Sequence, residues 1–110
     1  MFLKDYYPKL NKKYNKVKFD GIAFDSCEVK SGYIFFAIKG NNVDGNKFVK
    51  EAIKKGSKII ISENIKERYE NNILYLKNKN PRKVIAEIAS KINYIRPNNL
   101  FLLQILLEFF

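Results

Sequence analysis

One stretch of the chain carries the pattern strand, helix, strand, and this pattern restricts the folds that the sequence can adopt. An apolar run, YIFFAI at 33–38, precedes a segment with apolar residues at helical spacing, and a β-branched run, KIIIS at 58–62, follows it. The apolar residues that share one helical face are Phe48, Val49, Ala52 and Ile53. Strands joined by a helix pair in parallel through a right-handed crossover. The stretch therefore predicts an α/β fold.

Turn and cap residues predict where the helices begin and end. We expect Asp44 to cap the first helix and Gly56 to end it in the left-handed conformation. Asn80 is expected to cap a second helix whose first residue is Pro81, where the missing amide proton costs nothing. The second helix has an apolar stripe formed by Val84, Ile85, Ile88, Ala89 and Ile92.

Other segments complete a small sheet. Residues 17–24 predict a strand in which Gly21 marks a bulge or a close backbone approach, and residues 73–76 predict another strand. Residues 64–72 predict a surface loop or short helix, and residues 2–10 a short helix. With 110 residues, the chain is expected to form a single small α/β domain, a mixed, partly parallel sheet with flanking helices.

Net charge and composition limit the classes of binding partner that the chain is expected to have. The 21 Lys and Arg residues against 11 Asp and Glu residues give a formal net charge of +10, which is typical of proteins with anionic partners. A basic nucleic-acid-binding module is one alternative. It is disfavoured because base reading uses bidentate arginine, and only Arg68, Arg82 and Arg96 are arginines. A solvated lysine surface, in a chain rich in residues with AT-rich codons, explains the charge better than a dedicated nucleic-acid surface.

The chain has no histidine and a single cysteine, Cys27. Histidine-based catalysis, disulfides and cysteine zinc clusters within one chain are thereby excluded, and this cysteine usage is typical of a cytoplasmic protein. The N-terminus meets Lys4 and Asp5 too early for a signal peptide. The apolar tail at 100–110 is shorter than the roughly 20 residues that cross a bilayer, so no membrane partner is expected.

Two polar corners flank the 33–38 strand. Gly40 and Gly45 have the spacing of a phosphate loop, but Lys47 comes one place late and Phe48 stands where a hydroxyl should hold Mg²⁺. We therefore expect no nucleotide hydrolysis and no metal site. The backbone amides and the Asn side chains of this loop are suited to binding an anion, although a plain turn and helix cap also explains the loop.

The other corner is Asp25-Ser26 at the end of the first strand. Ser26 can donate to a phosphate or carbonyl oxygen, and Asp25 can fix the turn or accept from a sugar or base N–H, although an ordinary turn explains both. Ser26 has no base partner, and Cys27 is expected to be partly buried and unreactive. The residues alone predict a ligand-binding α/β domain with no catalytic residue.

A long ordered pattern, DSxxVxxGxxFxAxxGxxxDGxxFxxxAxxxG, resembles the N-terminal domain of the Mur ligases, which build the peptide stem of bacterial peptidoglycan. Residues 80–83 and 86–89 are most similar to the ligase that adds the third residue, diaminopimelate or lysine. The D-alanyl-D-alanine-adding ligase remains an alternative. The residues that carry the pattern are Asp25-Ser26, Val29-Lys30, Gly32, Phe35-Phe36-Ala37, Lys39-Gly40, Val43-Asp44-Gly45, Phe48, Ala52-Ile53 and Gly56.

The resemblance implies that residues 1–99 form the substrate-binding domain and that the apolar tail at 100–110 is a truncated or frameshifted start of the ATP-binding domain. It implies binding of the UDP end of UDP-N-acetylmuramoyl-L-alanyl-D-glutamate. Where the family usually has arginine after Asp-Ser, Cys27 removes a bidentate donor. By position, the substrate contacts would be Phe24, Ser26, Asn41, Asn42 and Val43.

The resemblance also implies that the ATP site, the Mg²⁺ ligands and the amino-acid-binding domain would lie beyond residue 110. We therefore expect this chain alone to need no cofactor and to be inactive as a ligase. The tail could be a frameshifted remnant of the next domain. A separately encoded remainder of the ligase and a decayed product without function are both compatible with the sequence.

Overall fold

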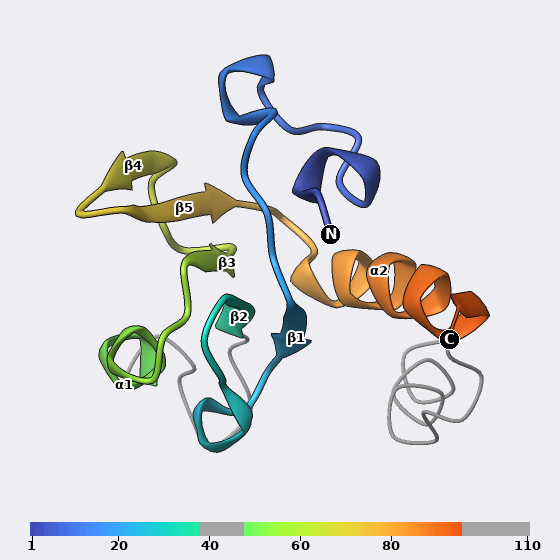
Figure 1. Cartoon of the computed structure of the whole chain (residues 1–110). Helices are drawn as coiled ribbons and strands as arrows, with labels where there is room; N and C mark the ends of the chain where they lie inside the picture. Colours follow the sequence, from blue (N-terminus) through green and yellow to red (C-terminus); the bar gives the residue numbers. More distant parts are fainter. Residues whose placement is uncertain (38–47, 96–110) are drawn as a thin grey trace. The chain divides into compact units, whose positions relative to one another are not determined.

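The structure, a computed structural model, describes residues 1–37 and 48–95 (Figure 1). Its contacts group into two units. Among the described residues, the first contains Met1 and residues 18–81, and the second contains residues 2–17 and 82–95. The apolar tail at 100–110 lies outside the described residues, so the prediction about it stays a prediction.

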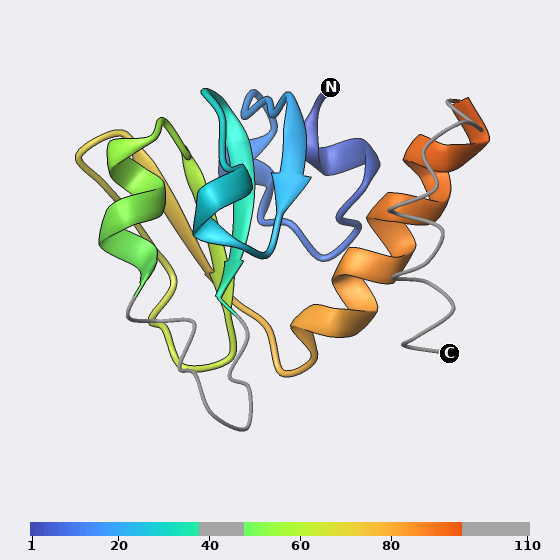
Figure 2. The ribbon, with the colours of Figure 1, turned by 90° about the horizontal axis from the view of Figure 1, so that it is seen from below.

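The first unit is built on a five-stranded sheet with the order β1-β2-β3-β5-β4 (Figure 2). Strands β1, β2, β3 and β5 pair in parallel, and β4 pairs with β5 in antiparallel orientation. The α/β fold class with a mixed sheet is thereby confirmed. The strands are β1 (Gly21–Ala23), β2 (Tyr33–Ala37), β3 (Ile59–Ser62), β4 (Arg68–Glu70) and β5 (Ile73–Lys77).

Helix α1 (Val49–Lys54) packs against β2 and the 3-10 turn η3 (Ser26–Glu28). Val49 and Ile53 pack on a buried cluster that includes Ala52 from the helix itself. The predicted stripe is wrong at Phe48, which is exposed in the N-cap position and makes no side-chain cap bond. The predicted cap Asp44 lies outside the described residues.

Glycine stands at three positions that a side chain would disturb, Gly21, Gly32 and Gly56. Gly56 follows α1 at φ +108°, as predicted, and a Cβ there would lie 2.8 Å from Cα of Ser31. The Gly32 amide donates to the Gly56 carbonyl at 2.8 Å, so this approach ties the turn before β2 to the end of α1. At Gly21 a Cβ would lie 2.7 Å from the Tyr33 ring, so a side chain, and not the predicted backbone, lies close to this glycine.

Two sequence-based predictions about strands are wrong. The strand predicted at 17–24 is only three residues long, β1. The segment predicted as a loop or short helix at 64–72 contains β4, which turns into β5 through Asn71 and Asn72. Both asparagines have positive φ, 53° and 65°, the backbone of a two-residue hairpin turn. Asparagine tolerates positive φ, so the Asn71-Asn72 pair is the one sequence feature that indicates this hairpin turn.

The second unit contains helix α2 (Pro81–Ile95), whose helical residues from 82 onward lie in this unit, and two 3-10 turns, η1 (Leu3–Asp5) and η2 (Lys12–Tyr14). The predicted helix start at Pro81 is confirmed. The helix predicted at 2–10 is a single 3-10 turn. The Lys91 ammonium donates to the Asp5 carbonyl at 3.0 Å, which joins α2 to the N-terminal segment. All five residues of the predicted stripe are buried: Val84, Ile85, Ile88, Ala89 and Ile92.

Candidate functional site

The candidate site begins at the carboxyl ends of β1 and β2. These strands are parallel, with Ala23 opposite Phe35, so both end at the same edge of the sheet. Ligands of open α/β sheets bind at this edge. Phe24, Asp25 and Ser26 follow β1 directly, and β2 ends at Ala37.

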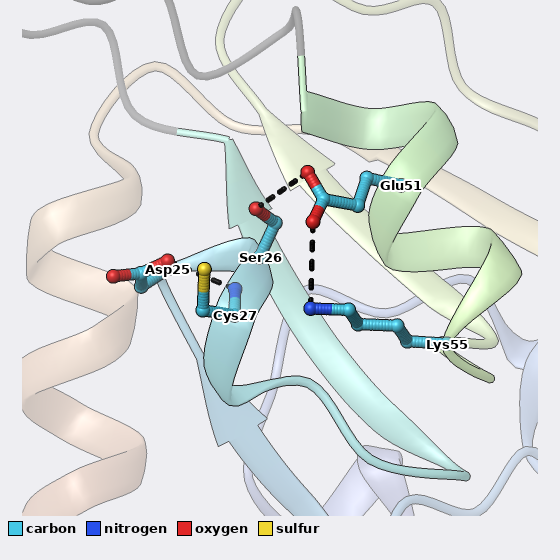
Figure 3. A network of polar contacts seen from close by, with 5 residues as sticks. All are labelled: Asp25, Ser26, Cys27, Glu51 and Lys55. Carbon is cyan, nitrogen blue, oxygen red and sulfur yellow. Dashed lines mark hydrogen bonds and ion pairs between the residues drawn. The ribbon is translucent and has the colours of Figure 1, made fainter.

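Asp25 has the turn-fixing role that the sequence allowed. Its carboxylate accepts a hydrogen bond from the Cys27 backbone N–H at 2.9 Å and so caps η3. Figure 3 shows this carboxylate pointing away from Glu51. The cap holds the corner that positions the next residue, Ser26.

Ser26 is buried, with 4% of its surface exposed, and its hydroxyl donates to Oε2 of Glu51 at 3.2 Å (Figure 3). The other carboxylate oxygen of Glu51, Oε1, lies 3.4 Å from Nζ of Lys55. These contacts join η3 to α1. The proton that Ser26 was expected to give to a ligand oxygen is therefore donated within the protein.

Glu51 was not among the site residues predicted from the sequence. Its spacing to Lys55 is the ordinary i, i+4 pattern of an exposed helix face, which does not point to a site. Its partner Ser26 is 25 positions earlier in the chain. Ser26 and Glu51 meet only because the sheet forms and α1 packs on η3, so no local sequence pattern predicts their contact.

The prediction for Cys27 is wrong, because the cysteine is exposed. The 3-10 turn explains the difference. Consecutive residues of such a turn point in different directions, so η3 directs Ser26 toward α1 and leaves Cys27 at the surface.

Of the other predicted site residues, the structure describes only Phe24. Phe24 is half-buried beside Asp25 and Ser26, at the edge where β1 ends. Asn41, Asn42 and Val43 lie outside the described residues, as does the loop from Gly40 to Gly45. The structure thus brings Phe24 and Ser26 to one corner, and the second corner stays a prediction.

Within 1–37 and 48–95, no three His, Cys, Asp or Glu side chains are grouped so that they could hold a metal ion. No helix in this described part of the chain has both the length and the apolar character needed to cross a membrane.

Comparison with known families gives a match over most of the chain. Residues 18–93 match the profile of the Mur ligase family, catalytic domain. A ligase of Clostridium tetani named UDP-N-acetylmuramoyl-L-alanyl-D-glutamate–2,6-diaminopimelate ligase is 38% identical over 98 residues, covering 82% of this chain. A ligase of the same name from Fusobacterium nucleatum is 37% identical over 82 residues, or 74% of this chain. The chain spans 20% and 15% of these two relatives' lengths.

Solved structures agree on the fold. A UDP-N-acetylmuramoyl-L-alanyl-D-glutamate–2,6-diaminopimelate ligase superimposes with a TM-score of 0.62 at 20% identity, covering 86% of this chain and 19% of that one. A protein of Acinetobacter baumannii named UDP-N-acetylmuramoylalanyl-D-glutamyl-2,6-diaminopimelate–D-alanyl-D-alanyl ligase gives a TM-score of 0.60 at 22% identity, covering 79% of this chain and 19% of that one. At these identities the likeness concerns the fold alone.

Proposed function

The chain belongs to the Mur ligase family, and on this premise we propose that it binds the UDP end of UDP-N-acetylmuramoyl-L-alanyl-D-glutamate. The observation that carries the proposal is the identity of 38% to a ligase named for that substrate. The fold supports it, because the residues expected to contact the substrate follow parallel strands at one sheet edge.

We assign the contacts to two corners. Phe24 and Ser26 form the corner after β1, and Asn41, Asn42 and Val43 belong to the segment that follows β2. The second segment is rich in amide groups and glycines, which suit a diphosphate because they donate hydrogen bonds without adding negative charge. The proposed ligand therefore bridges the ends of two neighbouring strands.

The reaction is that of peptidoglycan peptide synthesis. In the complete enzymes, the carboxylate of the bound dipeptide precursor would be joined to an amino group of diaminopimelate as an amide. The curated relatives favour diaminopimelate over D-alanyl-D-alanine as the added group, since the more similar sequences carry that name.

In the Mur ligase family ATP supplies the energy for this amide bond, and Mg²⁺ assists the reaction of ATP. The described residues of this chain do not fit them, because no cluster of metal-binding side chains is present in 1–37 or 48–95. Phe48 also replaces the hydroxyl that a phosphate loop would offer to Mg²⁺. We therefore derive no step of ATP chemistry from these residues and restrict the proposal to substrate binding.

Isothermal titration calorimetry tests the proposal against its main rival. The chain is titrated with UDP-N-acetylmuramoyl-L-alanyl-D-glutamate and, separately, with a random-sequence oligonucleotide at about 0.15 M salt, where exposed charges are well screened. Saturable one-to-one binding of the muramoyl dipeptide supports the proposal. Saturable binding of the oligonucleotide alone would instead assign the net charge of +10 to a nucleic-acid partner.

A further inference from the structure

The bond between Ser26 and Glu51 carries an inference about how the candidate site selects its ligand. We propose that Glu51 is a positioning residue that keeps the Ser26 hydroxyl turned toward α1, so that Ser26 offers the ligand an acceptor and not a donor. The inference rests on the proposed function and deepens it. Ser26 would then meet an N–H or O–H group of the ligand, such as a base imide or a sugar hydroxyl, and not a phosphate oxygen.

The first step is the direction of the hydrogen bond. An ionised carboxylate can only accept, so at the 3.2 Å contact the Ser26 hydroxyl must be the donor. A serine hydroxyl has one proton and two lone pairs. Donation to Glu51 uses the proton and leaves the lone pairs for a ligand.

The second step is the permanence of that bond. Ser26 is 4% exposed, so its hydroxyl has little water to turn to if it leaves Glu51. Buried polar groups keep their hydrogen bonds because losing one costs the full desolvation of the group. The Lys55 ammonium contacts the other oxygen of the same carboxylate at 3.4 Å, which holds Glu51 in the orientation that receives the proton.

The negative charge of Glu51 also affects which ligand group can approach Ser26. A ligand phosphate placed at Ser26 would approach the negative carboxylate of Glu51, whereas a neutral N–H or O–H group would not be repelled. Lys55 offsets part of this charge, and solvent weakens both the attraction and the repulsion, because the Lys55 and Glu51 side chains are 37% and 45% exposed. Hydrogen bonding and electrostatics thus favour the same class of ligand group.

Two small probes test whether Ser26 meets a neutral ligand group or a phosphate. Uridine is neutral and has N–H and O–H donors beside its carbonyl acceptors, and inorganic pyrophosphate at neutral pH is strongly charged and offers mainly acceptors. We expect Ser26→Ala to weaken uridine binding about fivefold to tenfold, measured by NMR titration of the full chain, and to change pyrophosphate binding by less than about twofold. Weaker pyrophosphate binding with unchanged uridine binding would overturn the inference.

The sign of the Glu51→Ala effect is the sharper test. If Ser26 accepts from the ligand, loss of Glu51 frees the hydroxyl to rotate, and uridine binding falls about twofold to fivefold. If Ser26 donates to the ligand, Glu51 is a competitor, and its loss strengthens uridine binding. The latter result contradicts the inference. Glu51→Gln should restore most of the affinity, because its amide oxygen still accepts the proton.

Glu28→Ala is the matched control, because Glu28 is an exposed carboxylate on the same turn η3. Any effect of removing one negative charge appears in both variants, and the difference between them reports the Ser26 bond. A variant that only loosens the fold would weaken the binding of both probes alike, and thermal unfolding checks this directly.

If the wild-type chain binds UDP-N-acetylmuramoyl-L-alanyl-D-glutamate but the variants show no change in selectivity, the inference fails and the proposed function stands. If the wild type binds neither that substrate nor uridine, the proposed function fails with it.

Discussion

Some residues near the candidate site fix the backbone or another side chain, and others expose their side chains. Gly56 and Asp25 hold turns, and Ser26 is held by Glu51. Cys27 stands beside them with its side chain exposed. The corner therefore combines a fixed backbone with one surface position at which a side chain can be changed freely.

Gly56→Ala should lower the free energy of unfolding by about 1–3 kcal/mol, because an L side chain at φ +108° is strained and its Cβ would meet Ser31 at 2.8 Å. Chemical denaturation measures the change. Lys54→Ala, at an exposed position in the same helix end, is the control and should stay within about 0.5 kcal/mol of the wild type. A Gly56→Ala protein as stable as this control would contradict the close approach.

Cys27→Arg should tighten binding of UDP-N-acetylmuramoyl-L-alanyl-D-glutamate about tenfold, because a guanidinium can pair with the diphosphate through two hydrogen bonds. The position is exposed, so the larger side chain should leave stability almost unchanged. Calorimetry compares this variant with Cys27→Lys, which adds the same charge without the planar fork. Equal affinities for the arginine, lysine and wild-type proteins would place Cys27 away from the ligand.

At the scale of elements, the sequence predicted what depends on local pattern. Strand β3 was recognised from a short β-branched run, which is buried along its whole length, and the apolar stripe of α2 was recognised because apolar residues repeat with the period of a helix. Strand β4 was missed because its three residues, Arg68 to Glu70, are polar and too few to show a period. The Ser26–Glu51 contact was missed because it exists only after α1 has packed on η3.

The β4–β5 hairpin offers a test of its turn. Asn72 has φ 65°, so Asn72→Gly should raise the free energy of unfolding by up to about 1 kcal/mol, since glycine adopts this backbone without steric cost. Asn72→Val should lower it by about 1–2 kcal/mol, because a β-branched residue is strained there. Denaturant titrations of both variants give the answer. Changes of the same sign for glycine and valine would argue against a left-handed residue at this position.

At the scale of the whole molecule, the family and the fold follow from sequence pattern, and the candidate site follows only in part. Parallel pairing brings the end of β1 to the edge where β2 ends, which is where a Mur ligase substrate is proposed to bind. The sequence identified Phe24 and Ser26 at this edge but not the helix residue that fixes the serine hydroxyl. The chain spans 20% of the length of a relative named as a ligase, so the proposal assigns it substrate binding and no more.

The most direct test of that assignment is a map of backbone amide shifts by NMR while UDP-N-acetylmuramoyl-L-alanyl-D-glutamate is added to the chain. We predict saturable shifts concentrated at residues 24–27 and 41–43, with the Asn71–Asn72 turn unaffected as an internal reference. Shifts that do not saturate, or that concentrate at the β4–β5 hairpin while residues 24–27 stay unchanged, would contradict the proposed site.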